Sequence, residues 1–70
     1  MWKAYKYKGS YVNVYIRKIN NNELIISFPP KRDDFKKDFD KKFKMKGYAN
    51  VSEEGDTIHY IKNFGGDTNE

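Results

Sequence analysis

The sequence contains no cysteine and a single histidine, His59, and these two scarcities exclude several kinds of chemistry. Without cysteine the chain forms neither disulfides nor thiolate metal sites. One histidine is too few for most histidine-based metal sites, and no cysteine–histidine nucleophile is possible. Phosphate-binding loops, nucleotide fingerprints and nucleophile elbows are missing as well. We therefore expect no metal, no cofactor and no enzymatic activity.

Long apolar runs are also missing. The longest, Leu24-Ile25-Ile26, is far too short to span a membrane. The N-terminus shows no basic segment followed by an apolar stretch and a cleavage site, as a secretion signal would. The lack of cysteine fits a reducing compartment. We expect a cytoplasmic protein without a membrane partner.

For its size the chain is rich in aromatic residues. Its 70 residues are enough for one small domain, whose stability is expected to be marginal. One Trp, six Tyr and five Phe bury much area per residue, which helps so small a domain to form a core. Formation of a homodimer, or docking on a partner, would bury further surface.

Residues 1–18 alternate between two kinds of side chain, as in a β-hairpin. Gly9-Ser10 is typical of a two-residue type II′ loop, which would pair Tyr5 with Val14 and Trp2 with Arg17. In that register Trp2 and Arg17 can stack as a cation–π pair. Because side chains alternate across a strand, one face collects the core candidates Tyr5, Tyr7, Val12, Val14 and Ile16. The other face interleaves aromatic and basic residues, namely Trp2, Lys6, Lys8, Tyr11, Tyr15 and Arg17.

The Asn20-Asn21-Asn22 run predicts the second turn. A three-residue loop would pair Ile16 with Ile26 and keep the apolar residues on one face, whereas a two-residue loop would mix the faces. Asparagine tolerates the left-handed backbone that such loops need. Pro29-Pro30 then ends the third strand, because proline cannot donate a hydrogen bond to a sheet.

The segment from Lys31 to about Lys46 is predicted to form a helix. Gly47 is interpreted as its C-terminal stop. Phenylalanines recur every fourth residue and make one narrow apolar stripe, the Phe stripe, which consists of Phe35, Phe39 and Phe43.

Charged residues cover the rest of the predicted helix. Asp33-Asp34 are interpreted as caps of the free amide groups at its start. Three acidic residues each lie four positions before a lysine, and ion pairs between them would stabilise the helix. These pairs are Asp33 with Lys37, Asp38 with Lys42, and Asp40 with Lys44. The face opposite the Phe stripe is a secondary basic face, formed by Lys37, Lys41 and Lys44.

Residues 48–64 are predicted to form a second hairpin in one of two registers. A three-residue Glu-Glu-Gly loop would pair Asn50 with Ile58, and a four-residue loop ending at Asp56 would pair Val51 with Ile58. Residues 65–70 lack periodicity and are interpreted as a frayed tail. The prediction is an α+β fold in a single domain over residues 1–64. It consists of an antiparallel meander packed on one helix, in the order β-β-β-α-β-β.

Charge and composition favour a binding function. The formal net charge of +4 and the pI of about 9.3 favour acidic partners, nucleic acid first. Aromatic and basic side chains on an open sheet are typical of single-stranded nucleic-acid binding. The leading hypothesis is a non-enzymatic module that binds nucleic acid or a host nucleoprotein complex. Its size and its richness in Lys and Asn also resemble small accessory proteins of phages and mobile elements.

Two alternatives stay open. Trp, Tyr and Arg dominate hot spots in protein interfaces. The same face would therefore suit an inhibitor or adaptor that binds a host defence complex, as anti-CRISPR proteins do, or a transcription complex. The enzymatic alternative is a ribonuclease with His59 as general base, which needs a carboxylate or lysine from elsewhere in the fold.

Overall fold

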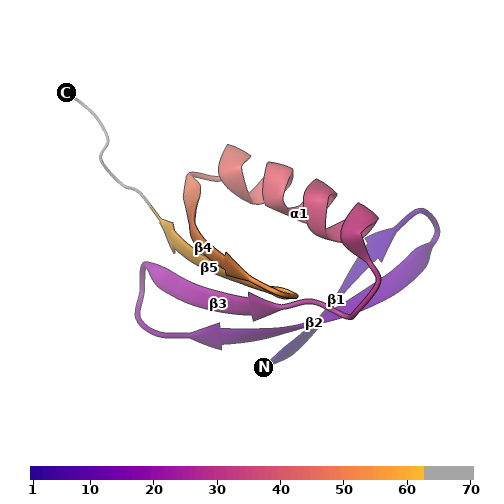
Figure 1. Cartoon of the computed structure of the whole chain (residues 1–70), viewed down its shortest axis with the longest axis horizontal. Coiled ribbons are helices and arrows are strands. Elements are labelled where there is room, and N and C mark those ends of the chain that lie inside the picture. Colours follow the sequence, from indigo (N-terminus) through magenta and orange to yellow (C-terminus); the bar gives the residue numbers. More distant parts are fainter. Residues whose placement is uncertain (63–70) are drawn as a thin grey trace.

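In the computed structural model, which describes residues 1–62, one helix lies across one face of a five-stranded antiparallel sheet (Figure 1). The predicted α+β class and the order β-β-β-α-β-β are confirmed. The predicted tail at 65–70 and the last two residues of the predicted second hairpin lie outside the described residues. The elements are β1 (Trp2–Tyr7), β2 (Ser10–Lys18), β3 (Glu23–Ser27), α1 (Asp33–Met45), β4 (Tyr48–Glu54) and β5 (Thr57–Lys62).

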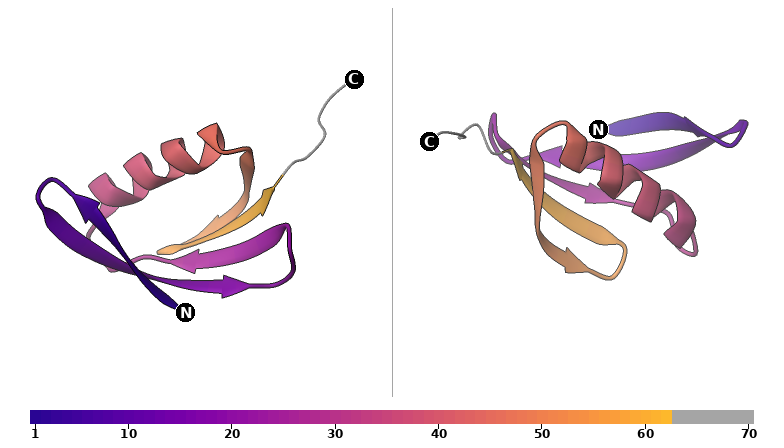
Figure 2. Two further views of the ribbon diagram at one scale, coloured as in Figure 1. Left: turned by 180° about the vertical axis from the view of Figure 1, so that it is seen from behind. Right: turned by 90° about the horizontal axis from the view of Figure 1, so that it is seen from above.

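The strand order is β1-β2-β3-β5-β4, so the last hairpin extends the sheet. Strand β5 pairs with β3, and β4 forms one edge of the sheet. Both β3 and β4 run antiparallel to β5, so they are parallel to each other. Helix α1 connects them by crossing one side of the sheet (Figure 2). No helix within residues 1–62 is long and apolar enough to cross a membrane.

The first hairpin closes with Lys8-Gly9, so the predicted Gly9-Ser10 loop is wrong. Both loop residues have positive φ, 50° at Lys8 and 82° at Gly9, as a type I′ turn requires. Tyr5 consequently pairs with Val12 instead of Val14. This shift by two residues preserves the alternation, and the predicted core residues of β2 are buried, at Val12, Val14 and Ile16.

The second turn has the predicted register, with Ile16 opposite Ile26. The backbone amide of Ile19 donates to the carbonyl of Glu23 and closes a loop over residues 20–22. None of the three asparagines has a positive φ, which corrects the predicted left-handed conformation. Instead, the Asn22 amide donates a 2.8 Å hydrogen bond to Oδ1 of Asn20, as in an Asx turn.

Helix α1 begins at Asp33, two residues later than predicted, because Lys31 has a φ of 62° and is not helical. Asp33-Asp34 lie in the first turn and do not act as the cap, since the cap residue is Arg32 and no side chain caps it. Gly47, with a φ of 97°, follows the helix as predicted. Two of the acid–lysine pairs form, Asp38 with Lys42 and Asp40 with Lys44, both at 3.1 Å.

The core joins the Phe stripe to the sheet. Phe39 stacks on Phe43 with ring centroids 4.5 Å apart, and Phe43 stacks on Tyr48 at 4.6 Å. Phe39 also makes an edge-to-face contact with Phe28 at 5.2 Å. Tyr60 of β5 is completely buried beneath this cluster. The aromatic residues thus supply much of the buried area that so short a chain needs.

The last hairpin follows neither predicted register. Its loop has two residues, Gly55-Asp56, and Gly55 has a φ of 60°, as the first position of a type II′ turn requires. A bulge between Asn50 and Ser52 shifts the pairing by one residue. As a result, Asn50 and Glu53 lie opposite the buried residues of β5 and both face α1.

Candidate nucleic-acid interface

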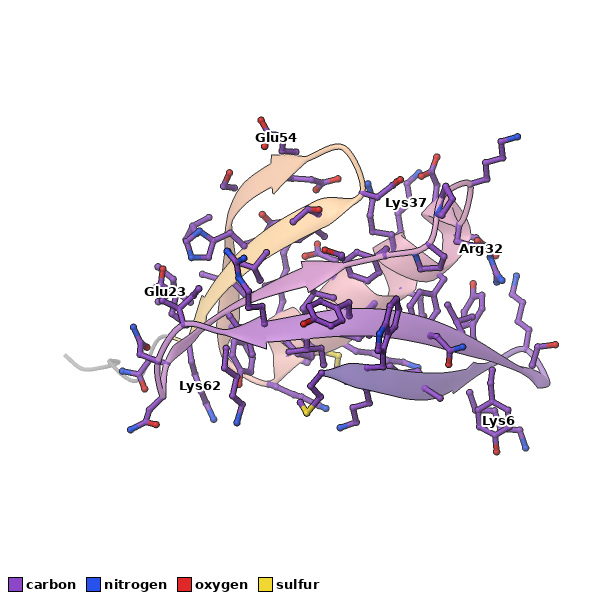
Figure 3. All side chains as sticks on the ribbon, turned by 90° about the horizontal axis from the view of Figure 1, so that it is seen from below. Lys6, Glu23, Arg32, Lys37, Glu54 and Lys62 are labelled. Carbon is purple, nitrogen blue, oxygen red and sulfur yellow. The ribbon has the colours of Figure 1, made fainter. Side chains whose placement is uncertain are left out.

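The sheet face opposite α1, here called the open face, is crossed by no other element within residues 1–62 (Figure 3). Lys6, near the tip of the first hairpin, and Glu23, near the β2–β3 turn, lie at opposite ends of this face in Figure 3. Strand pairing sets its side chains in rows. One row contains Trp2, Tyr15, Ser27 and Thr57, and the next contains Arg17, Ile25 and His59.

Trp2 and Tyr15 form an aromatic pair on the open face. Their ring centroids are 5.2 Å apart and their planes meet at 70°. Trp2 remains 71% exposed and Tyr15 39% exposed, so the pair leaves large apolar surfaces in water. The predicted Trp2–Arg17 pair is wrong, because the two-residue change of register sets Trp2 opposite Tyr15. Trp2 and Tyr15 therefore form a larger aromatic platform than the sequence indicated.

Tyr11 and Lys6 form a second exposed group, nearer the hairpin tip. They are a cross-strand pair, and Tyr11 is 70% exposed. Tyr11 and Tyr15 are four residues apart on β2, which corresponds to about 13 Å along an extended strand. The open face thus presents two aromatic groups, the Trp2–Tyr15 pair and Tyr11, and Lys6 lies beside Tyr11.

Arg17 lies beyond the aromatic pair, opposite Ile25 of β3. It lines a shallow hollow of about 320 Å³ together with Tyr15, Ile25, Ser27 and Thr57. The lining contains no carboxylate. The guanidinium is therefore positioned to bind an anion beside an aromatic ring.

Lys8 does not belong to the open face, although the sequence placed it there. It lies in the turn, where the alternation of side chains ends. Its Nζ lies 5.3 Å from the ring centre of Tyr7, and Tyr7 packs edge-on against Phe35 of α1. Lys8 also helps to lower the pKa of Asp34, after the larger effects of Arg32 and a backbone hydrogen bond. These contacts place Lys8 on the helix side of the hairpin.

Sequence reasoning missed the partner of His59. Nε2 of His59 lies 2.5 Å from Oε2 of Glu23, a residue 36 positions away on the neighbouring strand. The other oxygen of Glu23 accepts a hydrogen bond from Asn20 at 3.1 Å. Both side chains of the pair are half-buried. Only the pairing of β3 with β5 brings the two together, so no local sequence signal could have identified the pair.

The secondary basic face lies on α1, on the other side of the molecule from the open face. Lys44 forms an ion pair with Asp40 at 3.1 Å. Lys37 lines a hollow of about 320 Å³ whose other polar residues include three carboxylates, at Asp33, Asp40 and Glu53. Negative and positive groups therefore alternate on this side, and we do not include it in the candidate site.

Within residues 1–62, no group of three or more potential ligands among His, Cys, Asp and Glu is placed to hold a metal ion. Comparisons with protein-family models, with curated proteins and with solved structures found no match.

Proposed function

We propose that the protein binds single-stranded nucleic acid on its open face, as a module without enzymatic activity. The observation that carries this proposal is the exposed Trp2–Tyr15 pair, on a face that no other described element covers. Lys6 and Arg17 on the same face add positive charge beside the rings. The basic pI of the chain supports the same class of partner.

In this proposal the two aromatic groups stack bases and the two cations contact phosphates. Stacking of one base on an aromatic side chain contributes about 1–3 kcal/mol and tolerates any sequence. Trp2 and Tyr15 would hold one base, and Tyr11 a second base further along β2. Arg17 and Lys6 lie near these rings, where each would neutralise a phosphate and make the affinity depend on salt.

The intrinsic fluorescence of Trp2, the single tryptophan, provides a direct test. Titration with a 20-nucleotide oligo(dT) or oligo(U) in about 50 mM salt is expected to quench it, because the base would contact the indole. Anisotropy of a labelled oligonucleotide would give the affinity in parallel. The affinity is expected to fall by roughly one power of the salt concentration per phosphate contact. Absence of binding to single-stranded DNA and RNA at this salt concentration would disprove the proposal.

Variants of the open face locate the site. Tyr15→Ala and Arg17→Ala are each expected to weaken binding by about 2 kcal/mol or more, roughly 30-fold, as truncated hot-spot residues do. Lys41→Ala, on exposed helix surface away from this face, is the matched control and should bind as the wild type does. Equal loss in Lys41→Ala and Arg17→Ala would indicate attraction by net charge alone.

One observation favours a protein partner instead. At its other end the open face also carries two isoleucines, the exposed Ile61 and the partly buried Ile25, and the exposed Ile19 follows the end of β2. Apolar residues of this kind are typical of protein interfaces. Affinity capture from a nuclease-treated lysate separates the two functions. A stoichiometric protein retained after nuclease treatment, and lost with Tyr15→Ala, would support the inhibitor or adaptor alternative.

The His59–Glu23 pair is the one observation that favours the ribonuclease alternative, because it places a carboxylate beside the imidazole. RNA recovered intact from the binding assay would agree with a module that only binds. RNA cleavage by the wild type that disappears in His59→Ala would instead show that the protein is an enzyme.

A further inference from the structure

A groove runs between β1 and the C-terminal half of α1, on the helix side of the sheet. It consists of two hollows of about 330 and 260 Å³, and both are lined by Tyr5, Phe43 and Lys46. It exists because the Phe stripe is only one residue wide, whereas the sheet has five strands. The lining of the larger hollow also includes Phe39, Lys42 and Met45, and that of the smaller one includes Met1, Lys3 and Lys18.

The floor of the groove is apolar and held in place by the core. The ring of Tyr5 makes an edge-to-face contact with Phe39 at 5.1 Å. The ring of Phe43 stacks on Tyr48 at 4.6 Å. Two methionines lie in the lining, Met45 at 80% exposure and Met1 at 60%. Methionine is flexible and polarisable, so these two side chains can adapt to an apolar guest.

The charged residues that line the groove are all lysines. Lys42 is paired with Asp38, but within residues 1–62 no ion pair engages Lys3, Lys18 or Lys46. The Nζ of Lys3 lies 5.3 Å from the ring centre of Tyr5, over the floor of the groove.

Lys46 repeats this arrangement over the other floor ring. Its Nζ lies 5.7 Å from the ring centre of Phe43, so an ammonium group lies over each of the two rings that both hollows share. The C-terminus of α1 adds roughly half a negative charge to this region. The unpaired ammonium groups outweigh it, so the groove combines an apolar floor with a positive rim.

We infer that this groove binds a small anionic amphiphile, an alkyl chain that carries a carboxylate. The chain would lie on Tyr5 and Phe43, and the carboxylate would contact Lys3 and Lys46. The size of the larger hollow, about 330 Å³, supports a small molecule, because pockets for such ligands start at about 300 Å³. A stable protein partner would need an interface of at least about 1,000 Å². This site is separate from the open face and does not depend on the function proposed for it.

The chain offers a specific probe, because its two methionines both line the groove. Labelling with ¹³C-methyl methionine reports occupancy there by NMR, with any purification tag kept at the C-terminus. Sodium decanoate, below its micelle concentration at neutral pH, is expected to shift both methyl signals in a saturable way. Acetate, which lacks the chain, and decyltrimethylammonium, which carries the opposite charge, are expected to leave them unchanged.

Charge reversal with a matched control tests the rim. The Lys3→Glu/Lys46→Glu double variant should weaken decanoate binding at least about tenfold. The Lys6→Glu/Lys41→Glu variant makes the same change of net charge, on β1 and on α1, but neither residue lines the groove. It should bind decanoate as the wild type does. Equal weakening in both variants, equal binding of the cationic amphiphile, or no saturable shift with decanoate would each overturn the inference.

Vesicles of phosphatidylglycerol distinguish two sources of such a ligand. Cosedimentation of the wild type, but not of Lys3→Glu/Lys46→Glu, would assign the acyl chain to a membrane lipid. Binding of monomeric decanoate without cosedimentation would assign it to a free acid.

Discussion

The phenol of Tyr60 donates a 2.8 Å hydrogen bond to Oδ1 of Asp40, and this bond ties the interior strand β5 to helix α1. Asn50 of β4 donates to the same oxygen at 3.3 Å. Lys44 forms an ion pair with the other oxygen at 3.1 Å. Burial and the neighbouring Asp40 carboxylate raise the pKa of Tyr60, so the phenol stays protonated and keeps donating. The carboxylate of Asp40 thus connects the helix to both strands of the last hairpin.

Tyr60→Phe should destabilise the protein by about 1.5–3 kcal/mol, as expected for a hydrogen bond to a charged group. The ring would stay, so the loss would measure the hydroxyl alone. Tyr48→Phe is the matched control, because the Tyr48 ring packs in the same cluster and its hydroxyl forms no hydrogen bond within residues 1–62. It should change stability by less than about 0.5 kcal/mol. Equal midpoints in urea unfolding would contradict the assignment.

Acid should weaken the contact between the helix and the last hairpin. Burial raises the pKa of Asp40, but hydrogen bonds from Tyr60, Lys44 and Asn50 outweigh it and lower the pKa below its usual 3.8. The ion pair with Lys36 likewise lowers the pKa of Glu53 below its usual 4.5.

A lowered pKa in the folded state means that the unfolded chain binds protons first as the pH falls. The stabilisation by Asp40 and Glu53 is therefore complete above about pH 5 and is lost as the pH falls through their folded-state pKa values. Urea midpoints measured from pH 7 to pH 2 should decrease once the pH falls below the usual pKa values of these two carboxyl groups. The decrease should be smaller in Asp40→Asn, and an identical decrease would argue against this role of Asp40.

Phe39→Ala should be the most damaging change in the helix. Phe39 is the middle residue of the Phe stripe and contacts Tyr5, Phe28 and Tyr60. Truncation should cost about 3–5 kcal/mol, comparable to the whole stability of so small a domain. Lys41→Ala, on the exposed side of α1, should cost less than about 0.5 kcal/mol. Thermal melts would show little or no cooperative transition for the first variant and a wild-type transition for the second.

Lys8→Asn should stabilise the protein by about 0.5–1 kcal/mol. Lys8 holds a φ of 50°, which is strained for lysine, and Asn-Gly is the preferred pair in a type I′ turn. Gly9→Ala should do the opposite and cost about 1–2 kcal/mol, since φ at Gly9 is 82°. No atom lies within 4 Å of a Cβ built at Gly9, so this loss would come from the backbone alone. Calorimetric melting temperatures that move in the same direction for both variants would exclude this turn type.

Periodicity in the sequence predicted which side chains face the core. In the first hairpin the predicted loop was wrong by one position, yet Val14 is buried and Tyr15 is exposed as expected. A shift by two residues keeps the alternation, so the faces do not depend on the turn. The spacing of Phe35, Phe39 and Phe43 predicted the buried side of α1 for the same reason. Patterns of this kind depend only on residues that are close together in the chain, so the sequence alone contains them.

Which residues meet across elements was decided by the tertiary structure. Trp2 lies against Tyr15 instead of the predicted Arg17, because two residues in left-handed conformation, Lys8 and Gly9, move the hairpin register. The bulge near Val51 turns Asn50 and Glu53 toward α1, which no alternating pattern predicts. These placements depend on backbone angles at single residues, and several residue types can adopt such angles.

By itself, the sequence determined the number and order of elements, the buried faces of β2, β3 and α1, and the aromatic–basic composition of the open face. The tertiary structure decided that β5 lies between β3 and β4, and with it the contact of His59 with Glu23. It also decided that a one-residue-wide stripe leaves a groove beside β1. The physical reason is the distance along the chain over which each effect acts. Alternation and helical spacing act between neighbours along the chain, whereas strand order and uncovered surface depend on how whole elements compete for the same core.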